Sequence, residues 1–468
     1  MKLCQITNCS DDREICGLSA DSREIKKGFL FGSLNGDQYI KSALDNGASA
    51  FIVPEDCSFD FPKHIAVIRT PNPNKEFAQT VARYYEYIPP HILMITGTNG
   101  KTSIADFVRQ VLTMMGEKAV STGTLGIIKG NEDPIPSPNT TPNSVTIHRE
   151  LRELYNEGFK YAIMEASSHG LCQYRLGGIR CHTAGFTNLT RDHLDYHKTF
   201  ENYLDAKLIL FRETLCENGT AVLNADIECF EKIRQACLEN GKKVITYGYN
   251  GKELRLLKTT PLPHGQKLDI EFYGRSIELE IPLSGEFQAM NVLCAIGILT
   301  EETGRPEEVL KHITKIHGAK GRLELVGQKN GAAIYIDYAH TPDALENVIR
   351  ALRPHTARHL HVLFGCGGDR DAGKRPIMGK LANELADFVY ITDDNPRTEN
   401  ATEIRKQIMN ACPKGIDIAN RAEAIKTAIN RLKTGDVLIL AGKGHETGQY
   451  VNGKIYHFSD HEEVLKNI

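Results

Sequence analysis

The spacing of apolar residues predicts an α/β chain in which strands and helices alternate. Short apolar runs at 28–34 and 49–54 are separated by helical stretches, and an amphipathic helix is predicted at 74–87. Two consecutive prolines at 89–90 then interrupt the pattern, because proline has no backbone N–H and cannot continue a helix. We therefore expect a first small α/β domain at residues 1–88.

A strand–loop–helix pattern restarts in the second predicted domain, residues 89–316. The apolar run 91–95 leads into a glycine-rich loop and a helix. Further apolar runs at 161–167 and 183–190, with a helical stretch at 144–158, predict a mostly parallel sheet with crossover helices.

One segment of this region differs from the rest. At 267–283 two alternating runs flank Gly-Arg-Ser, which predicts an antiparallel hairpin that turns at these three residues.

The third predicted domain, residues 317–468, repeats one arrangement along its length. Apolar runs begin the segments 332–343, 359–371, 387–397 and 436–446, and each run ends in a loop rich in glycine and charged residues. In an open α/β sheet, ligands bind outside the carboxyl ends of the strands. One polar loop is ordinary, but four at the same edge of a sheet indicate a binding site.

Composition narrows the class of protein. The chain is 41% hydrophobic and 25% charged, with a formal net charge of -3, so no basic excess indicates nucleic acid or an anionic membrane as partner. No apolar stretch approaches the ~18 residues that span a bilayer, and the N-terminal segment is polar. The 12 cysteines are scattered without a Cys-x-x-Cys pair. We expect a cytoplasmic monomer without disulfides.

The loop after the run 91–95 has the chemistry of a phosphate site. TGTNGKT joins a strand to a helix, where backbone N–H groups favour an anion. Lys101 can reach the outer phosphates of ATP and the Thr102 hydroxyl can ligate Mg²⁺. The spacing departs from the usual P-loop, because Gly97 and Gly100 enclose only two residues. A glycine turn that merely caps a helix is the alternative.

Several downstream residues could complete a metal site. Glu165 ends an apolar run and can supply a carboxylate for Mg²⁺. His193 and His197 would share one face of a helix, which leaves a zinc site open as an alternative. A solvated surface loop without a metal is a further alternative. Lys207 has the pattern of an ordinary helix lysine, and nothing in the sequence alone singles it out.

Taken in order, seven motifs resemble those of the Mur ligases, the ATP-dependent amino-acid ligases of peptidoglycan precursor synthesis. They are GTNGKT, EASSHGL, TNLTRDHLDYH, AKLILF, GEFQAMN, GRLE and DYAHTPDAL, between residues 97 and 345. DSRE at 21–24 and NTTPNS at 139–144 resemble the member of the family that acts on UDP-N-acetylmuramoyl-L-alanyl-D-glutamate. The resemblance extends over essentially the whole chain.

The resemblance implies an architecture and a reaction. The three α/β domains would be a UDP-sugar-binding domain, a central P-loop ATPase domain and a C-terminal Rossmann-like domain that binds the amino acid. ATP would phosphorylate the D-Glu carboxylate to an acyl phosphate, which the amine of meso-2,6-diaminopimelate would attack. Mg²⁺ is the implied cofactor, and ATP, the UDP-dipeptide and diaminopimelate are the implied substrates.

The resemblance also assigns roles to individual residues. The implied catalytic residues are Lys101, Glu165, His193 and Lys207. The implied metal ligands are Thr102, Glu165, His193 and Lys207, the last as a carbamate. The implied ATP contacts are Gly97, Thr98, Asn99, Gly100, Lys101, Thr102, Ser103, Asn291, Arg322 and Asp337. The implied UDP-sugar and dipeptide contacts are Ser22, Asn139, Thr140, Thr141, Ser167, Gln173 and Arg175. Gln288 departs from the pattern, where an asparagine is expected.

The segment ITDDNPRTEN, 391–400, could be only a strand-end turn with a solvated arginine. Its DNPR matches the diaminopimelate version of the family's motif. The second carboxylate of diaminopimelate, which L-lysine lacks, suits the planar, bidentate cation of Arg397. Asp394 and Asn395 are expected to hold the amine end. The implied diaminopimelate contacts are Arg370, Asp394, Asn395, Pro396, Arg397, Gly442 and Glu446.

Two other functions compete with this interpretation. Folylpolyglutamate synthetase is a related ligase with a similar phosphate loop, but we expect it to lack a full UDP-sugar domain, and NTTP and DNPR argue against it. A catalytically inactive nucleotide-binding regulator is the second alternative. The intact set of Lys101, Glu165, His193 and Lys207 argues against that function.

Overall fold

The structure is a computed structural model that describes residues 1–468 except 35, 138, 263 and 264. The chain forms two compact units, Met1–Leu254 with Cys294–Val309, and Arg255–Leu293 with Leu310–Ile468. The predicted α/β class with mostly parallel sheets is confirmed by the sheets described below. The domain boundaries at 88 and 316 stay predictions.

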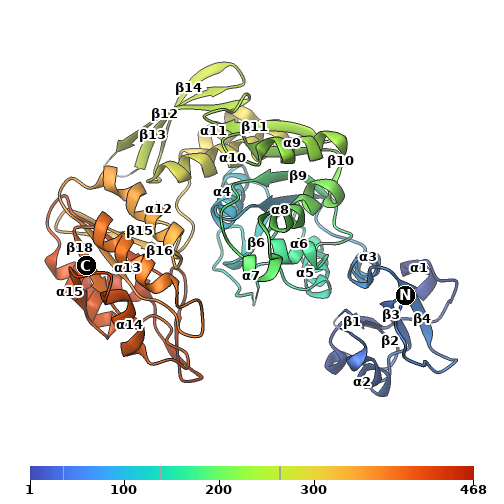
Figure 1. The fold of residues 1–468 in the computed structure, drawn as a ribbon. Helices are drawn as coiled ribbons and strands as arrows, with labels where there is room; N and C mark the ends of the chain where they lie inside the picture. The colour runs from blue at the N-terminus through green and yellow to red at the C-terminus, as the bar shows by residue number, and fades with distance from the viewer. Residues whose placement is uncertain (35, 138, 263–264) are drawn as a thin grey trace. The chain divides into compact units, whose positions relative to one another are not determined.

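The N-terminal part is a small parallel sheet, drawn in blue in Figure 1. Its strands, in spatial order, are β1 (Gly17–Ser19), β2 (Phe29–Gly32), β3 (Ala50–Pro54) and β4 (Ala66–Thr70). Its helices are α1 (Leu3–Ile6), α2 (Ile40–Asp45) and α3 (Pro73–Tyr85). The start of α3 is fixed by Pro73 and by the Asn72 side chain, which accepts a hydrogen bond from the Lys75 backbone N–H.

The central sheet carries the phosphate loop. Seven of its ten strands are β5 (His91–Thr96), β6 (Ala119–Gly123), β7 (Gly126–Lys129), β8 (Tyr161–Glu165), β9 (Cys181–Phe186), β10 (Leu215–Asn224) and β11 (Lys243–Gly248), in the spatial order β11-β10-β9-β5-β8-β6-β7. Every pair in this series is parallel except β6–β7. The chain passes from one side of β5 to the other between β8 and β9, so the loops after these three strands meet at a topological switch point.

The helices of this region are α4 (Lys101–Met114), α5 (Ser144–Asn156), α6 (Ser168–Cys172), α7 (Leu194–His197), α8 (Phe200–Ile209), α9 (Phe230–Glu239), α10 (Glu286–Thr303) and α11 (Pro306–Ile313). A π-helical turn, Leu210–Thr214, follows α8. α4 begins at Lys101, directly after the glycine-rich loop in sequence, and this start agrees with the predicted strand–loop–helix unit.

The predicted hairpin forms, but its turn lies elsewhere. β12 (Leu254–Leu262) precedes β13 (Gly265–Phe272), which pairs antiparallel with β14 (Arg275–Ile281). Tyr273 and Gly274 make the turn with φ of 48° and 81°. The prediction of a turn at Gly274-Arg275-Ser276 was therefore wrong by one residue. A two-residue turn with positive φ at both positions matches the twist of the strands. The turn therefore ends at Gly274, and Arg275 and Ser276 are the first residues of β14.

The C-terminal sheet has six strands in the order β15-β16-β20-β17-β18-β19. They are β15 (Glu324–Lys329), β16 (Ala332–Asp337), β17 (Leu360–Phe364), β18 (Phe388–Ile391), β19 (Gly415–Asp417) and β20 (Val437–Ala441), and only β15 is antiparallel to its neighbour. The helices are α12 (Pro342–Leu352), α13 (Lys374–Leu385), α14 (Ala401–Met409), α15 (Arg421–Arg431) and α16 (Asp460–Asn467). A separate hairpin, β21 (Gly448–Val451) with β22 (Lys454–His457), follows β20.

Two apolar cores cover the two faces of this sheet. Val362 and Phe364 of β17 pack in one core with α12, α13 and α14, whereas Leu363 packs in the other with α15 and α16. Side chains alternate between the faces of a strand, so this division follows from the sequence of β17. Both faces are buried by helices, which Figure 1 shows around the strands. Access for a ligand is therefore left to the strand ends.

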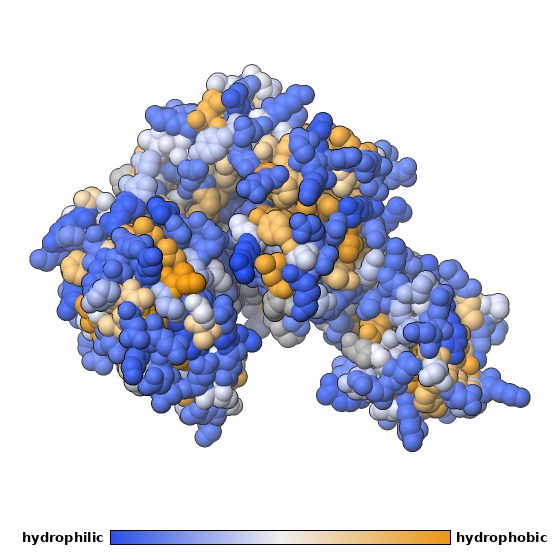
Figure 2. Space-filling model, in the orientation of Figure 1, coloured by the Kyte–Doolittle hydropathy of each residue, from blue (hydrophilic) through white to orange (hydrophobic). Residues whose placement is uncertain are grey.

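Among the helices of the described residues, none is both long enough and apolar enough to cross a bilayer. Figure 2 shows hydrophilic residues over most of the visible face, with small apolar patches between them. The exposed apolar side chains include Ile455 and Tyr456 of β22.

A buried ion pair in the C-terminal sheet gives a test of this packing. Arg421 of α15 donates two hydrogen bonds of 2.7 Å to Asp460 of α16, and their side chains are 1% and 0% exposed. Asp460→Ala leaves a buried guanidinium without its counter-charge, so we expect the free energy of unfolding to fall by about 3–5 kcal/mol. Urea denaturation followed by far-UV circular dichroism measures the change.

The matched control is Asp12→Ala. It removes an ion pair with Lys2 in which the side chains are 79% and 56% exposed. Water already solvates both groups, so the unfolding midpoint should hardly move. Equal destabilisation by the two substitutions would contradict this account of the buried pair.

Candidate active site

The phosphate loop requires glycine at two positions. Gly97 has φ of 140°, and a Cβ there would lie 1.9 Å from Thr187 Oγ1. Gly100 has φ of 90° and is the N-cap residue of α4. The first N–H groups of a helix have no partner inside it, and they carry the positive end of the helix dipole. This geometry suits an anion at the start of α4.

The segment after β9 forms several hydrogen bonds with this short loop. The backbone N–H groups of Thr98 and Asn99 donate to the carbonyl and side-chain oxygens of Asn188, each over 2.9 Å. The Thr190 N–H donates to Thr98 Oγ1, which also lies 3.2 Å from the hydroxyl of Tyr203 in α8. The neighbouring strand end therefore braces the loop.

Two lysines converge on this loop. Lys101 Nζ donates to the carbonyl oxygens of Gly97 and Thr98 over 2.9 and 2.8 Å. Lys207 Nζ, from α8, donates to the same Gly97 oxygen over 2.8 Å and lies 4.5 Å from the ring centre of Tyr203. Lys207 is 1% exposed. Burial, together with the positive charge of Lys101, lowers the pKa of Lys207 well below its usual value, against a smaller opposing effect of Asp192.

Glu165, at the end of β8, faces the start of α4. Its Oε2 accepts a hydrogen bond from Thr102 Oγ1 over 3.0 Å, and its side chain is buried. Thr124 adds two bonds to this carboxylate, from its N–H over 2.7 Å and from its hydroxyl over 3.1 Å. Carboxylate and hydroxyl oxygens are ligands that Mg²⁺ accepts, so the donor set fits this ion.

The two histidines do not lie on one helix. His193 is the N-cap residue of α7 with φ of 52°, so it precedes the helix that contains His197. The His193 ring is 4.8 Å from that of His169, and His197 Nε2 lies 3.0 Å from Ser168 Oγ. The prediction that one helix contains both histidines was therefore wrong for His193, although the His197 ring also contacts that of His169, over 5.4 Å. In the described part of the chain, no group of three or more His, Cys, Asp or Glu is arranged to hold a metal.

Most of the residues implied for the dipeptide form a continuous network with Glu165. Thr141 Oγ1 donates to the Glu165 carbonyl over 2.9 Å and accepts from Ser167 Oγ over 2.9 Å. Arg175 donates to the Thr141 carbonyl over 2.7 Å and to Gln173 Oε1 over 2.7 and 3.0 Å. The structure therefore brings Thr141 together with the segments 165–167 and 173–175.

The remaining residues of this group lie differently. Thr140 Oγ1 is 3.1 Å from Thr124 Oγ1 and so touches the same network, whereas Asn139 is exposed. Ser22 belongs to the N-terminal sheet, where it is buried in a 3₁₀ turn and its carbonyl accepts a hydrogen bond from Asn46 Nδ2. Its predicted contact with the UDP-sugar stays a prediction.

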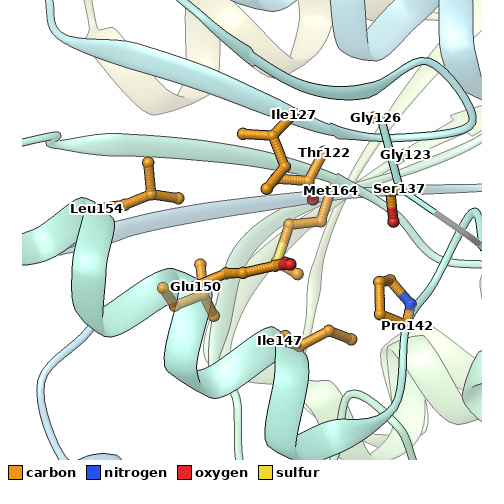
Figure 3. Close-up of a pocket in the computed structure, with 11 residues that line it drawn as sticks. Thr122, Gly123, Gly126, Ile127, Ser137, Pro142, Ile147, Glu150, Leu154 and Met164 are labelled. Atoms are coloured by element: carbon orange, nitrogen blue, oxygen red, sulfur yellow. The ribbon is translucent and has the colours of Figure 1, made fainter. Parts of the chain in front are cut away.

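A small pocket lies beside Ser137 and Pro142 (Figure 3). Its lining comes from β6, β7, β8 and α5, and includes Ser137, Pro142 and Met164. Its volume is about 10 Å³, which is enough for a single water molecule. Burial raises the pKa of Glu150, which also lines it. This pocket is therefore too small to receive a substrate.

In the second compact unit, the residues implied for the nucleotide lie at the end of β16. Asp337 accepts hydrogen bonds from the N–H groups of Leu323 and Ala339 over 2.6 and 2.7 Å. Burial raises the pKa of Asp337 to about 6, against the opposing effects of Arg322 and these N–H groups. The Arg322 guanidinium lies 4.6 Å from the ring centre of Tyr338.

Asn291, in α10, belongs to the same unit. Its Nδ2 donates to Gln288 Oε1 over 3.0 Å, and both side chains are buried. The unexpected glutamine therefore orients the predicted nucleotide contact.

The amino-acid cluster assembles from the loops after β18 and β20. Asn395 Nδ2 donates to Glu446 Oε2 over 2.9 Å. Gly442 has φ of 109°, and a Cβ there would lie 2.8 Å from Asp394 Oδ2, so glycine lets the two loops meet. The structure thus brings Asp394, Asn395, Gly442 and Glu446 together.

Arg397 contacts backbone groups of two neighbouring segments. It has φ of 52° and forms a β-bridge with Val451. Its Nη1 donates to the Gly368 carbonyl over 2.7 Å, and a Cβ on Gly368 would lie 2.0 Å from the Pro396 carbonyl oxygen. Arg370 is exposed in the same loop as Gly368. The loop after β17 therefore packs against the DNPR motif.

The first carboxylate of DDNPR has a different task. Asp393 forms an ion pair with Arg405 of α14, which also donates to Asp417 at the end of β19 over 2.7 Å. Asp393 thus ties α14 to the edge of the sheet, and only Asp394 faces the amino-acid cluster.

Sequence reasoning missed four residues of these clusters: Thr124, His169, Tyr203 and Lys443. Lys443 is 0% exposed, and its Nζ contacts Glu446, Asn395 and Gly448. A lysine between two glycines directly after an apolar run was a usable signal for Lys443. The other three have no distinctive spacing.

Two family models match the chain. The model of the Mur ligase middle domain matches residues 95–299, and that of the Mur ligase glutamate ligase domain matches residues 321–444. A UDP-N-acetylmuramoyl-L-alanyl-D-glutamate--2,6-diaminopimelate ligase of Agrobacterium fabrum is 47% identical over 460 residues, which cover 96% of this chain and 92% of that protein. The protein of the same name from Caulobacter vibrioides is 42% identical and covers 97% of this chain and 96% of its own length.

Solved structures agree in fold. A structure of a ligase with this same name aligns with a TM-score of 0.74 at 29% identity, over 100% of this chain and 98% of its own. A Mycobacterium tuberculosis folylpolyglutamate synthase with ADP aligns with a TM-score of 0.63 at 18% identity, over 77% of this chain and 89% of its own. At 18% identity the second likeness shows the fold alone. The family models and the nearly full-length relatives show that the chain belongs to the Mur ligase family.

Proposed function

We propose that this chain joins meso-2,6-diaminopimelate to the D-Glu carboxylate of UDP-N-acetylmuramoyl-L-alanyl-D-glutamate in peptidoglycan synthesis. As a Mur ligase it is an enzyme that forms a C–N bond and converts ATP to ADP and phosphate. The observation that carries the proposal for the amino acid is the cluster of Asp394, Asn395 and Glu446 beside Arg397. We also propose a cytoplasmic location, because ATP and nucleotide-linked precursors are found there.

The first step is transfer of the γ-phosphoryl group to the D-Glu carboxylate, which gives an acyl phosphate and ADP. Activation is needed because a carboxylate is a poor electrophile. Both reactants are anions, so the N–H groups at the start of α4 and the amine of Lys101 must offset their charge. Lys101 Nζ rests on the carbonyls of Gly97 and Thr98, from which it can turn to a phosphate without leaving the loop.

Thr102, Glu165, His193 and Lys207 as its carbamate would hold Mg²⁺, which when bound neutralises phosphate charge. The contact of Thr102 Oγ1 with Glu165 Oε2 supports this set, since two hard oxygens already meet at the start of α4. The lowered pKa of Lys207 supports the carbamate. A carbamate forms when an uncharged amine adds to CO₂ and loses one proton, and burial favours that uncharged form.

In the second step the amine of diaminopimelate attacks the acyl carbon, and phosphate leaves. The attacking nitrogen must give up a proton, and Asp394 or Glu446 can hold the ammonium groups of the amino acid beforehand. Arg397 suits the second carboxylate of diaminopimelate, because a guanidinium binds a carboxylate with two parallel N–H bonds. L-Lysine has no such group to offer.

One assay separates this function from its alternatives. Phosphate release should depend on the UDP-dipeptide and on diaminopimelate together, and not on folate. Release that requires folate, or no release with any acceptor, would exclude the proposed function.

The first prediction concerns the phosphate loop. Lys101→Ala should lower kcat by roughly 10²–10³ or more, because an electrostatic contact with the transferring group is lost. The melting temperature should hardly change, since the lost hydrogen bonds go to loop carbonyls. Lys232→Ala, at an exposed position of α9, is the control. Near-normal turnover of Lys101→Ala would show that the loop does not activate phosphate.

The second prediction concerns the carbamate. Lys207→Ala should be nearly inactive, and formate or acetate should restore part of its activity by supplying the missing carboxylate ligand. Lys101→Ala is the matched control, because added acids should not restore it. Full activity of Lys207→Ala without any acid refutes the carbamate, and equal rescue of both variants makes the effect nonspecific.

The third prediction concerns amino-acid choice. The unmodified enzyme should strongly prefer meso-diaminopimelate to L-lysine, and Arg397→Ala should raise the KM for diaminopimelate by roughly 10–100-fold through loss of a charged hydrogen-bond pair. The KM for ATP should stay nearly constant. Arg350→Ala, at an exposed site on α12, is the control. Equal use of lysine and diaminopimelate by the unmodified enzyme would refute this role of Arg397.

A further inference from the structure

Lys443 is a buried cation at the centre of the amino-acid cluster. Its side chain is 0% exposed, and its Nζ lies 3.2 Å from Asn395 Oδ1, 3.1 Å from Glu446 Oε2 and 2.7 Å from the Gly448 carbonyl oxygen. Removing an ammonium group from water is costly unless its partners compensate. Three acceptors around one amine meet that requirement, and two of them belong to residues of the proposed amino-acid site.

The backbone directs Lys443 into this position. Gly442 and Gly444, on either side of it, have φ of 109° and 52°. A Cβ on Gly444 would lie 2.8 Å from the Tyr338 Cβ, so a larger residue would push the loop outward. The chain can therefore reverse direction directly after β20 and turn the lysine inward.

These contacts fix the orientation of the Asn395 amide. Its oxygen receives hydrogen bonds from Lys443 Nζ over 3.2 Å and from the Tyr450 backbone N–H over 3.1 Å. An amide oxygen has two lone pairs, so both are used. Its nitrogen faces the Glu446 carboxylate, which only accepts, and a flipped amide would bring donor against donor and oxygen against oxygen.

The hairpin β21–β22 completes this arrangement. It supplies the Gly448 carbonyl to Lys443 and the Tyr450 N–H to Asn395, and Gln449 Nε2 donates to the Asp394 carbonyl over 2.6 Å. The hairpin thus forms the outer wall of the cluster, and Lys443 joins that wall to the DNPR motif.

We propose that Lys443 is a positioning residue for the amino acid, which fixes Asn395 as a hydrogen-bond donor and holds Glu446 beside it. Asn395 then presents its remaining N–H to a carboxylate of the substrate and cannot accept from an amine. This inference rests on the proposed function, and it changes the expectation that Asn395 holds the amine end. The ammonium groups are left to the carboxylates of Asp394 and Glu446.

The test compares KM values in a double-mutant cycle. Lys443→Met keeps most of the length of the side chain and removes its charge, and the KM for diaminopimelate should rise roughly tenfold or more because Asn395 and Glu446 lose their orientation. The KM for ATP should change less than about twofold, since the effect acts through these two residues. In an Asn395→Ala background, Lys443→Met should have a much smaller effect on the KM for diaminopimelate. Fully additive effects would mean a general structural role and would overturn the inference.

Matched variants keep the inference separate from folding defects. Lys454→Met, at an exposed position of the same hairpin, should leave every KM unchanged. If Lys443→Met does not fold, Asn395→Asp decides, because it keeps an oxygen beside Lys443 and replaces the N–H donor that faces Glu446 with a carboxylate oxygen. A rise of roughly tenfold in the KM for diaminopimelate is expected for Asn395→Asp, and an unchanged KM overturns the inference. Failure of the unmodified enzyme to use diaminopimelate would instead refute the proposed function.

Discussion

The amines of Lys101 and Lys207 donate to one carbonyl oxygen, that of Gly97, and the phosphoryl transfer proposed for the central sheet depends on this contact. Two ammonium groups this close repel each other, and the buried one, Lys207, has the lowered pKa. The arrangement therefore shifts Lys207 toward its uncharged form. Tyr203 and Lys207 both belong to α8 and both contact the loop, so this helix must lie beside the loop.

Both sheets that carry candidate residues use the same geometric principle. Side chains that are distant in sequence meet because parallel strands end at a common edge. In the central sheet the loops after β5, β8 and β9 supply Lys101, Glu165 and the Asn188 brace. In the C-terminal sheet the loops after β17, β18 and β20 supply Gly368, the DNPR motif and Glu446. Helices cover both faces of the second sheet, so its edge is the open route for a ligand.

Sequence reasoning recovered what depends on local pattern. The strands that end at Thr96, Glu165 and Ile391 follow from apolar runs, and the resemblance to Mur ligases is confirmed by the relatives. Sequence reasoning was wrong where the backbone angle φ of one or two residues determines where an element begins or ends. The hairpin turn moved to Tyr273-Gly274 because a tight turn needs two residues with positive φ, and α7 begins only after His193 for a similar reason. The role of Asp393 depends on its ion pair with Arg405. The Gly-Lys-Gly pattern marks Lys443, but it does not reveal the contact with Asn395, which is 48 residues away.

The buried charged residues include an ion pair between two helices and two lysines at the candidate sites. Arg421 and Asp460 compensate each other's charge, since both carboxylate oxygens accept from one guanidinium. Lys207 and Lys443 are equally buried, yet they rest largely on carbonyl and amide oxygens at strand ends. Lys443 also lies 3.1 Å from the Glu446 carboxylate, whereas the amine of Lys207 donates to a carbonyl oxygen, which carries no formal charge. An apolar side chain would cost less at either position if packing were the only demand. The cost is understandable if the two lysines organise neighbours that must meet charged substrates, phosphate at one sheet and an amino acid at the other.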